Sequence, residues 1–284
     1  MILITGATGQ LSRLVINHLL ESLPPQRIVA AVRDPAKAAD LRAQGIDVRQ
    51  ADYDKPDQWI SALEGVEKVL LISAPEVGLR TRQHQHVVEA AKQAGSVSFI
   101  AYTSVLRADT AALPYASEDR FTEGLIKATG IPCTFLRHGW YTENYTMNAA
   151  AAVQQGALYG CARNGRISGA ARADYAAAAA AVLAADRAEK IYELAGDSSF
   201  TLDEVAFEIS RQSGKSVKYV DMPEDEYRAL LIQYGLSANL ANTLALADTA
   251  AAEGEVHDES RALSQLIHRP TTPLADTVRD SLKA

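Results

Sequence analysis

Residues 3–12 read LITGATGQLS, an apolar run that passes into a glycine-rich turn and then into a helical pattern. A strand followed by such a turn points backbone N–H groups and a helix N-terminus at one spot, which favours a bound pyrophosphate. Gly6 permits the tight turn, and Gly9 lets the backbone approach the phosphates. Ser12 stands where the dinucleotide-binding pattern carries a third glycine, which allows the helix to pack closely on the strand. We therefore expect a dinucleotide site in which the helix is slightly displaced and the affinity lowered.

The rest of the first half repeats this alternation of strands and helices. Apolar runs rich in Val, Ile and Leu alternate with longer amphipathic stretches, which is typical of βαβ units. The pattern predicts an α/β fold, a doubly wound parallel Rossmann sheet covered on both faces. The strands are expected at residues 2–5, 27–32, 47–50, 69–72, 98–102 and 133–136, and the helices at 10–22, 35–43, 56–63, 83–94 and 117–129.

The second half follows the alternation less closely, and its last part is mostly helical in pattern. We expect residues 1–150 to form the NAD(P)-binding Rossmann domain. Residues 151–284 are expected to form a smaller, mostly helical C-terminal lobe on the substrate side, partly interleaved with the first domain. The alanine-rich run 175–185 is too short for a membrane span, which takes about 20 residues, and predicts a closely packed buried helix.

Composition excludes several classes of function. The net charge of the 284 residues is −7, which argues against nucleic-acid binding through a basic surface. The absence of a long apolar stretch argues against a membrane protein. The two cysteines, Cys133 and Cys161, form no metal-binding pattern and suggest a reducing, cytoplasmic setting. The run QHQH at 83–86 lacks metal-ligand spacing and predicts a solvated helix face. A homodimer stays open.

The end of the second expected strand bears on the choice of nucleotide. An arginine there can grip the 2′-phosphate of NADP, whereas a carboxylate can hold the ribose 2′-hydroxyl of NAD. Arg33 follows the strand directly and favours NADPH. Asp34 would favour NADH if the strand ran one residue further, and Pro35 leaves the direction of its side chain open. NADPH is therefore the expected cofactor and NADH the less favoured one.

Segments along nearly the whole chain resemble one known family. They read GATGQL at 6–11, AVRDPAKA at 31–38, QADYD at 50–54, GVEKVLLIS at 65–73, FIAYTS at 99–104, LRHGWYTEN at 136–144, RADYAAAAA at 172–180 and YELAGD at 192–197. Together they are similar to the NmrA-like group of atypical short-chain dehydrogenases. Within that group the resemblance is to the bacterial NAD(P)H:quinone oxidoreductases, with the triphenylmethane reductases as near relatives.

The resemblance implies a set of cofactor contacts at the strand ends. Around the pyrophosphate they would be Gly6, Thr8, Gly9, Gln10 and Leu11. Around the adenine and its ribose phosphate they would be Arg33, Asp52 and Tyr53. Toward the nicotinamide they would be Ser73, Ala74, Thr103, His138, Tyr141 and Asn144. His138 stands where relatives usually carry asparagine, so it is expected either to add a group that titrates near neutral pH or to be a hydrogen-bonded loop residue without a catalytic role.

The usual catalytic pair of short-chain dehydrogenases is missing. That pair is a tyrosine with a lysine four residues later, and none of the tyrosines here has lysine at that spacing; Tyr115, for instance, is followed by Asp119. This argues against carbonyl reduction, epimerisation and dehydration, which need positioned acid–base groups.

Quinone reduction makes a smaller chemical demand. A hydride can attack the electron-poor acceptor directly, and the product anion can take a proton from water, so no essential catalytic residue is expected. His138 and Asn144 are candidates for polarising a quinone oxygen. Trp140, Tyr141 and Tyr145 place three rings in one short loop and are expected to line the acceptor site, with core packing as the alternative.

These observations leave three functions to compare. The first is an NADPH-dependent reductase that passes a hydride to a quinone-like acceptor without flavin. The second is a non-catalytic NAD(P)-binding redox sensor, which the missing pair also allows. The third is a reductase of triphenylmethane-type dyes. The small-molecule partner is in each catalytic case an aromatic or quinone substrate, and no metal is expected.

Overall fold

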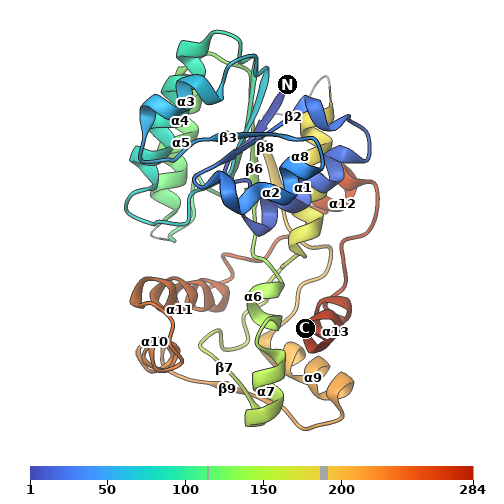
Figure 1. Cartoon of the computed structure of the whole chain (residues 1–284). Helices are drawn as coiled ribbons and strands as arrows, with labels where there is room; N and C mark the ends of the chain where they lie inside the picture. Colours follow the sequence, from blue (N-terminus) through green and yellow to red (C-terminus); the bar gives the residue numbers. More distant parts are fainter. Residues whose placement is uncertain (114, 186–190, 284) are drawn as a thin grey trace. The chain divides into compact units, whose positions relative to one another are not determined.

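A computed structural model describes residues 1–113, 115–185 and 191–283 of the chain (Figure 1). In these residues the chain forms two compact units. Unit 1 comprises residues 1–110, 115–138, 173–185 and 191–194, and unit 2 comprises residues 111–113, 139–172 and 195–283. The chain thus leaves unit 1 after His138 and returns to it at residue 173. The expected division at residue 150 into a cofactor side and a substrate side stays a prediction.

Within the described residues, unit 1 is built on a seven-stranded parallel sheet of order β3-β2-β1-β4-β5-β6-β8. The strands are β1 (Ile2–Ile4), β2 (Ile28–Val32), β3 (Asp47–Gln50), β4 (Lys68–Leu71), β5 (Phe99–Val105), β6 (Cys133–His138) and β8 (Ile191–Leu194). Every residue of β1 and β2 is buried, as the apolar runs predict for inner strands of a parallel sheet. The strand order reverses between β1 and β4, which opens a crevice at their carboxyl ends.

Helices cover both faces of this sheet. They are α1 (Gln10–Leu20), α2 (Ala39–Ala43), α3 (Pro56–Ala62), α4 (Arg80–Ala94), α5 (Ala116–Ala128) and α8 (Arg172–Ala184), with 3₁₀ turns at Pro25–Arg27 and Pro35–Ala38. Helices α3, α4 and α5 lie side by side on one face, and α1, α2 and α8 lie on the other (Figure 1). The predicted α/β class and Rossmann arrangement are confirmed.

Two strands run further than predicted. The expected ends at residues 102 and 136 extend to Val105 and His138, because these residues pair with each other and His138 pairs with Leu194 of β8. His138 is therefore the last residue of a buried strand, and the expectation that it lies in a loop was wrong.

The alanine-rich prediction is confirmed in α8. Tyr175 and half of the alanines of this helix are buried, since short side chains let the helix approach the sheet closely.

Unit 2 is mostly helical. Its helices are α6 (Glu143–Thr146), α7 (Ala149–Gln155), α9 (Leu202–Ser213), α10 (Glu224–Gln233), α11 (Ala238–Ala252), α12 (Ala262–Ile267) and α13 (Leu274–Lys283). Strand β7 (Ala157–Gly160) pairs in parallel with β9 (Lys218–Asp221). A separate core of this unit gathers around Ile167, Phe200 and Ile209. The predicted helical C-terminal portion is thus confirmed.

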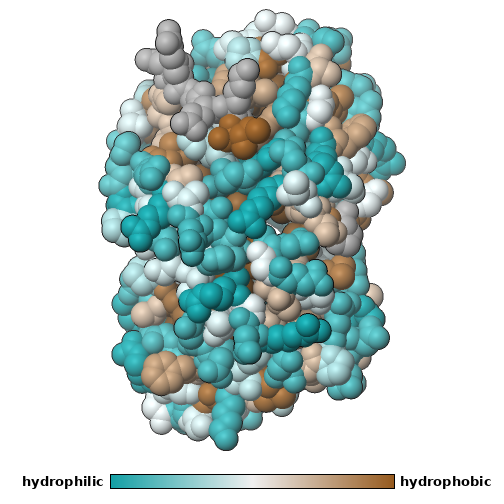
Figure 2. Space-filling view, turned by 180° about the vertical axis from the view of Figure 1, so that it is seen from behind, coloured by the Kyte–Doolittle hydropathy of each residue, from teal (hydrophilic) through white to brown (hydrophobic). Residues whose placement is uncertain are grey.

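The exposed surface carries few large apolar side chains. On the face shown in Figure 2, hydrophilic residues predominate and hydrophobic ones are scattered. The exposed large hydrophobic residues include Phe121 on α5, Phe207 on α9 and Tyr234 after α10. Among the described residues, no helix combines the length and apolar character needed to cross a bilayer.

Candidate functional site

The turn after β1 depends on its two glycines. Gly6 has φ +56°, a left-handed conformation that glycine adopts without strain. Gly9 donates its N–H to Gly6 O at 2.8 Å. A Cβ atom at Gly9 would come within 3.1 Å of that same carbonyl oxygen. The sequence LITGATGQ therefore forms the tight, open turn that its glycines predicted.

Helix α1 begins at this turn with its N-terminus uncapped. Gly9 is the N-cap residue, so no side chain accepts a hydrogen bond from the first turn, and that turn holds no acidic residue. Thr8, Gly9 and Gln10 are exposed, whereas Leu11 is buried. The free N–H groups and the positive end of the helix dipole form a fitting site for a phosphate group.

Ser12 fits into the turn instead of obstructing it. Its side chain is buried, and its hydroxyl donates to Gly6 O at 2.8 Å and lies 3.3 Å from Thr5 O. The serine thus closes the turn through a side-chain hydrogen bond where a glycine would leave only backbone contacts. This contact removes the reason for expecting a displaced helix and weaker binding.

Replacing Ser12 with glycine should therefore not tighten cofactor binding. We expect Ser12→Gly to lower the free energy of unfolding by about 1 kcal/mol, because it removes a buried hydrogen bond and adds backbone entropy. Urea unfolding and calorimetric titration with NADPH measure the two quantities. Ser12→Ala is the control that removes only the hydroxyl. A lower dissociation constant for Ser12→Gly alone would restore the view that the serine is an obstruction.

The residues after β2 resolve the competition between Arg33 and Asp34. Strand β2 ends at Val32, and the Asp34 carboxylate accepts a hydrogen bond from Ala36 N at 3.0 Å, capping the 3₁₀ turn. Arg33 is exposed, and no described carboxylate pairs with its guanidinium. The arginine is therefore available to a ligand at this strand end, while the aspartate is engaged locally.

Asp52 and Tyr53 follow β3 and are both half-buried. Asp52 Oδ1 accepts from Asp54 N at 3.1 Å, which shapes the local turn. The Tyr53 hydroxyl lies 2.7 Å from Thr5 Oγ1 and 2.8 Å from Ile72 O, at the ends of β1 and β4. Tyr53 thus ties together the two turns on either side of the crevice.

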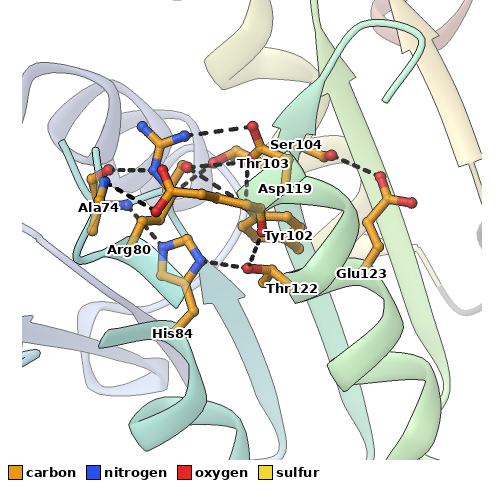
Figure 3. A network of polar contacts seen from close by, with 12 residues as sticks. Ala74, Arg80, His84, Tyr102, Thr103, Ser104, Asp119, Thr122 and Glu123 are labelled. Atoms are coloured by element: carbon orange, nitrogen blue, oxygen red, sulfur yellow. Dashed lines mark hydrogen bonds and ion pairs between the residues drawn. The ribbon is translucent and has the colours of Figure 1, made fainter. Parts of the chain in front are cut away.

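The turn after β4 is held by a network that the sequence did not reveal (Figure 3). Ser73 N donates to Thr103 Oγ1 at 2.9 Å. Ala74 N donates to His84 Nε2 at 2.9 Å, and Ala74 O accepts from Arg80 Nε at 2.8 Å. Two α4 side chains therefore fix both backbone groups of Ala74.

His84 is held as a neutral imidazole. Because its Nε2 accepts from Ala74, its Nδ1 carries the proton and donates to Thr122 Oγ1 at 2.9 Å. Burial, helped by the nearby Arg80, lowers the pKa of His84 to about 3. His84 and Gln83 are both buried. The prediction that residues 83–86 form a solvated face was wrong, because α4 turns these two side chains toward the turn after β4 and its neighbours.

Tyr102 and Asp119 form the buried centre of the network (Figure 3). The Tyr102 hydroxyl donates to Asp119 Oδ1, and Arg80 Nη1 lies 3.4 Å from Asp119 Oδ2. Burial raises the pKa of Asp119 to about 6, opposed by the charge of Arg80. Burial also raises the pKa of Tyr102, so its hydroxyl remains protonated. These groups fix the end of β5 against α4 and α5.

His138 is buried at the end of β6 and stacks on Tyr175, with ring centroids 4.4 Å apart. Burial lowers its pKa to about 3. The expectation of a group titrating near neutral pH was therefore wrong, because a charged imidazole is not stable in this apolar position. A neutral His138 can still accept or donate one hydrogen bond.

The aromatic loop after β6 belongs to unit 2, and its lining of an acceptor site stays a prediction. Its backbone is held by Ala170, whose N–H donates to Trp140 O at 3.1 Å. Trp140 packs against the core of unit 2, and the Tyr141 ring lies 4.5 Å from the Arg172 guanidinium carbon. Tyr145 packs edge-to-face on Phe200 and, with Asn144, lines a cavity in unit 2. Asn144 and Tyr145 therefore line the cavity, Trp140 and Tyr145 share the core of unit 2, and Tyr141 contacts Arg172.

Comparison with known proteins agrees with this geometry. The NmrA-like family matches residues 1–273. The chain belongs to the NmrA-like family. It is 52% identical to Quinone oxidoreductase 2 of Escherichia coli (strain K12) over 279 residues, which is 98% of this chain and 97% of that protein.

Solved NmrA-like structures superpose closely on this chain. The NADPH complex of the NADPH-dependent quinone oxidoreductase QOR2 from Escherichia coli has a TM-score of 0.96 and 51% identity, covering 99% of this chain and 100% of that one. The Citrobacter sp. triphenylmethane reductase complexed with NADP(H) has a TM-score of 0.95 and 38% identity, with coverage of 99% and 100%.

In the described part of this NmrA-like chain, no exposed tyrosine lies near β5 in the place of a proton donor. Tyr102 is buried against Asp119, and the Tyr115 ring lies under the Arg80 guanidinium, 5.9 Å from its centre. Among the described residues, no group of His, Cys, Asp and Glu is arranged to hold a metal ion. The arrangement can bind and orient a dinucleotide, and it positions no obvious proton-transfer pair.

Proposed function

We propose that this chain is an NADPH-dependent reductase that passes a hydride directly to a quinone-like conjugated acceptor without flavin. The observation that carries the proposal is the exposed Arg33 beside an uncapped α1 N-terminus, in a chain half identical to a quinone oxidoreductase. The guanidinium would bind the 2′-phosphate, and the α1 turn would bind the pyrophosphate. The cap that one Asp34 oxygen forms with Ala36 N engages this carboxylate locally, which supports NADPH over NADH.

The remaining cofactor contacts are proposed at the neighbouring strand ends. Ala74 and Ser73, held by His84 and Thr103, would support the ribose on the nicotinamide side. A rigid Ser73–Ala74 backbone matters because hydride transfer requires the nicotinamide and the reacting atom of the acceptor to be held close and aligned. Asp52 would border the adenine.

The proposed reaction needs no acid–base group of the protein for its chemical step. When bound, NADPH supplies one hydride, so the acceptor gains two electrons and one proton, and the product anion takes a second proton from water. His138 and Asn144 are proposed to orient an acceptor oxygen. Trp140, Tyr141 and Tyr145 are proposed for the acceptor side, with Tyr145 best supported because it lines a cavity.

A triphenylmethane dye is a second candidate acceptor. It is favoured by the 38% identity to the Citrobacter sp. reductase over the whole chain. Such a dye is also a conjugated electrophile, so it would use the same hydride transfer with a differently shaped pocket. A redox sensor that binds NAD(P) without turnover is the alternative from another class of function.

The deciding measurement is NADPH oxidation by the purified chain, with and without a panel of small quinones and a triphenylmethane dye, repeated with NADH. We expect acceptor-dependent oxidation with NADPH and much slower oxidation with NADH, in protein whose visible spectrum shows no flavin. Tight NADPH binding without turnover on any acceptor would reject the reductase in favour of the sensor.

The setting of the reaction is also a proposal. We propose a cytoplasmic enzyme, supported by the free thiols of Cys133 and Cys161. A homodimer remains a prediction that light scattering of the purified chain tests. We propose no nucleic-acid partner, in keeping with the net charge of −7.

A further inference from the structure

A cavity in unit 2 differs from its neighbours in carrying no charge. It has a volume of about 350 Å³ and is lined by parts of α6, α7, β7 and α10, together with the first residue of α9. None of its lining residues is Asp, Glu, Lys or Arg in the described structure, whereas two other cavities of unit 2 are lined by Glu224 and Glu253 or by Glu204 and Glu208. Such a lining offers no countercharge to a phosphate or a carboxylate.

The lining is apolar on one side and amide-bearing on another. Residues Leu158 of β7 and Leu230 and Leu231 of α10 supply aliphatic surface. Asn144 and Asn148, at the α6–α7 junction, supply the amides. Asn144 is also a candidate for orienting the acceptor oxygen. A residue proposed for the acceptor ring and a set of aliphatic side chains therefore line the same cavity.

The tyrosines make the walls of the cavity firm. Tyr145 packs on Phe200 and hydrogen-bonds to the buried Asp248. Tyr234 donates its hydroxyl to Gln155 Oε1 at 3.3 Å, which joins the end of α10 to the end of α7. A pocket formed before binding loses less entropy when it takes up a flexible chain.

We propose that this cavity binds an uncharged hydrocarbon substituent of the quinone acceptor, such as an alkyl or prenyl chain. The inference rests on the proposed function and names its substrate class: quinones with an apolar side chain. The volume lies at the lower end of the range for small-molecule pockets and is large enough for such a chain. Each buried methylene contributes favourably to binding, so the chain lowers the KM.

The test compares one benzoquinone ring with and without a decyl chain. Wild-type protein should have a KM about tenfold or more lower for the decyl compound, from the burial of a few methylenes. Ala151 lines the cavity from α7 and is exposed, so Ala151→Trp adds a ring there without removing packing. It should reduce the decyl preference to nearly one. Ala150→Trp, on the same helix and also exposed, should keep it.

A binding measurement separates this inference from the proposed function. Calorimetric titration of the oxidised decyl compound into wild type, Ala151→Trp and Ala150→Trp needs no turnover. If quinones are reduced but the chain makes no difference, or if both variants behave alike, the cavity proposal is overturned and the reductase stands. If no quinone is reduced but only Ala151→Trp loses decyl binding, the reductase is overturned and the hydrocarbon site is supported. Absence of both turnover and binding overturns both.

Discussion

Replacing Arg137 with methionine should lower the free energy of unfolding by about 3 kcal/mol, because it leaves the buried Glu123 carboxylate with only the exposed Lys127 ammonium, 3.8 Å away, as a countercharge. Arg137 Nη2 and Nε lie 2.7 and 2.9 Å from the two oxygens of Glu123, and both side chains are 3% exposed. Urea unfolding followed by circular dichroism measures the change. The hydrogen bond from Ser104 to Glu123 remains in the variant but supplies no charge.

Two further variants test the explanation for Arg137. Asp109 also pairs with Arg137, at 2.7 Å, but its side chain is 68% exposed, so Asp109→Asn should cost less than about 1 kcal/mol. The double variant Arg137→Met with Glu123→Gln should recover a large part of the lost stability, since it removes the buried charge. A loss for Arg137→Met no larger than that for Asp109→Asn would contradict the assignment.

Replacing Arg33 with alanine should raise the KM for NADPH about 10- to 100-fold and change the KM for NADH far less. The loss corresponds to one charge-assisted interaction of about 1.5–3 kcal/mol with the 2′-phosphate, at tenfold per 1.4 kcal/mol. Steady-state kinetics with both nucleotides and a saturating quinone measure the two values.

The matched control for Arg33 is the exposed Lys37, a few residues along in the 3₁₀ turn. Lys37→Ala removes the same charge from the same segment and should change the KM for NADPH by less than about threefold, the scale of an exposed charge interaction. Equal effects of Arg33→Ala on both nucleotides would show that the arginine does not read the phosphate.

Local sequence patterns predicted the sheet because its inner strands are short apolar runs bounded by turn residues. Buried strands such as Ile28–Val32 and helix ends such as Gly95, with φ +66°, depend on nearest neighbours in the chain. The ends of β5 and β6 could not be placed in this way. The end of β5 is set by its pairing with β6, and the end of β6 also by its pairing with β8, which lies more than fifty residues further along than β6.

The candidate site likewise has one part that local sequence patterns indicate and another that depends on contacts between distant segments. The glycine turn and Arg33 belong to a continuous motif, so the sequence indicated them. The hydrogen bonds of His84 and Arg80 to Ala74 join α4 to the turn after β4, and they form because this part of α4 is buried. The polar run that was expected on the surface therefore belongs to an interior network. One signal was available: Asp119, Thr122 and Glu123 have the three- and four-residue spacing of a single helix face, shared with the buried Ile126. A polar group at that spacing indicates a buried network when its neighbours are apolar.

The return of the chain to unit 1 at residue 173 has a consequence for synthesis on the ribosome. Strand β6 pairs with β5 as soon as both have emerged, but its other edge is covered only by β8, and Arg137 meets Glu193 only there. Until residues 191–194 have left the exit tunnel, the nascent sheet exposes an unpaired strand edge, which is prone to wrong pairing. A fragment that ends at residue 150 would keep that edge permanently, so the nucleotide-binding unit is not separable by cutting the gene at a single point.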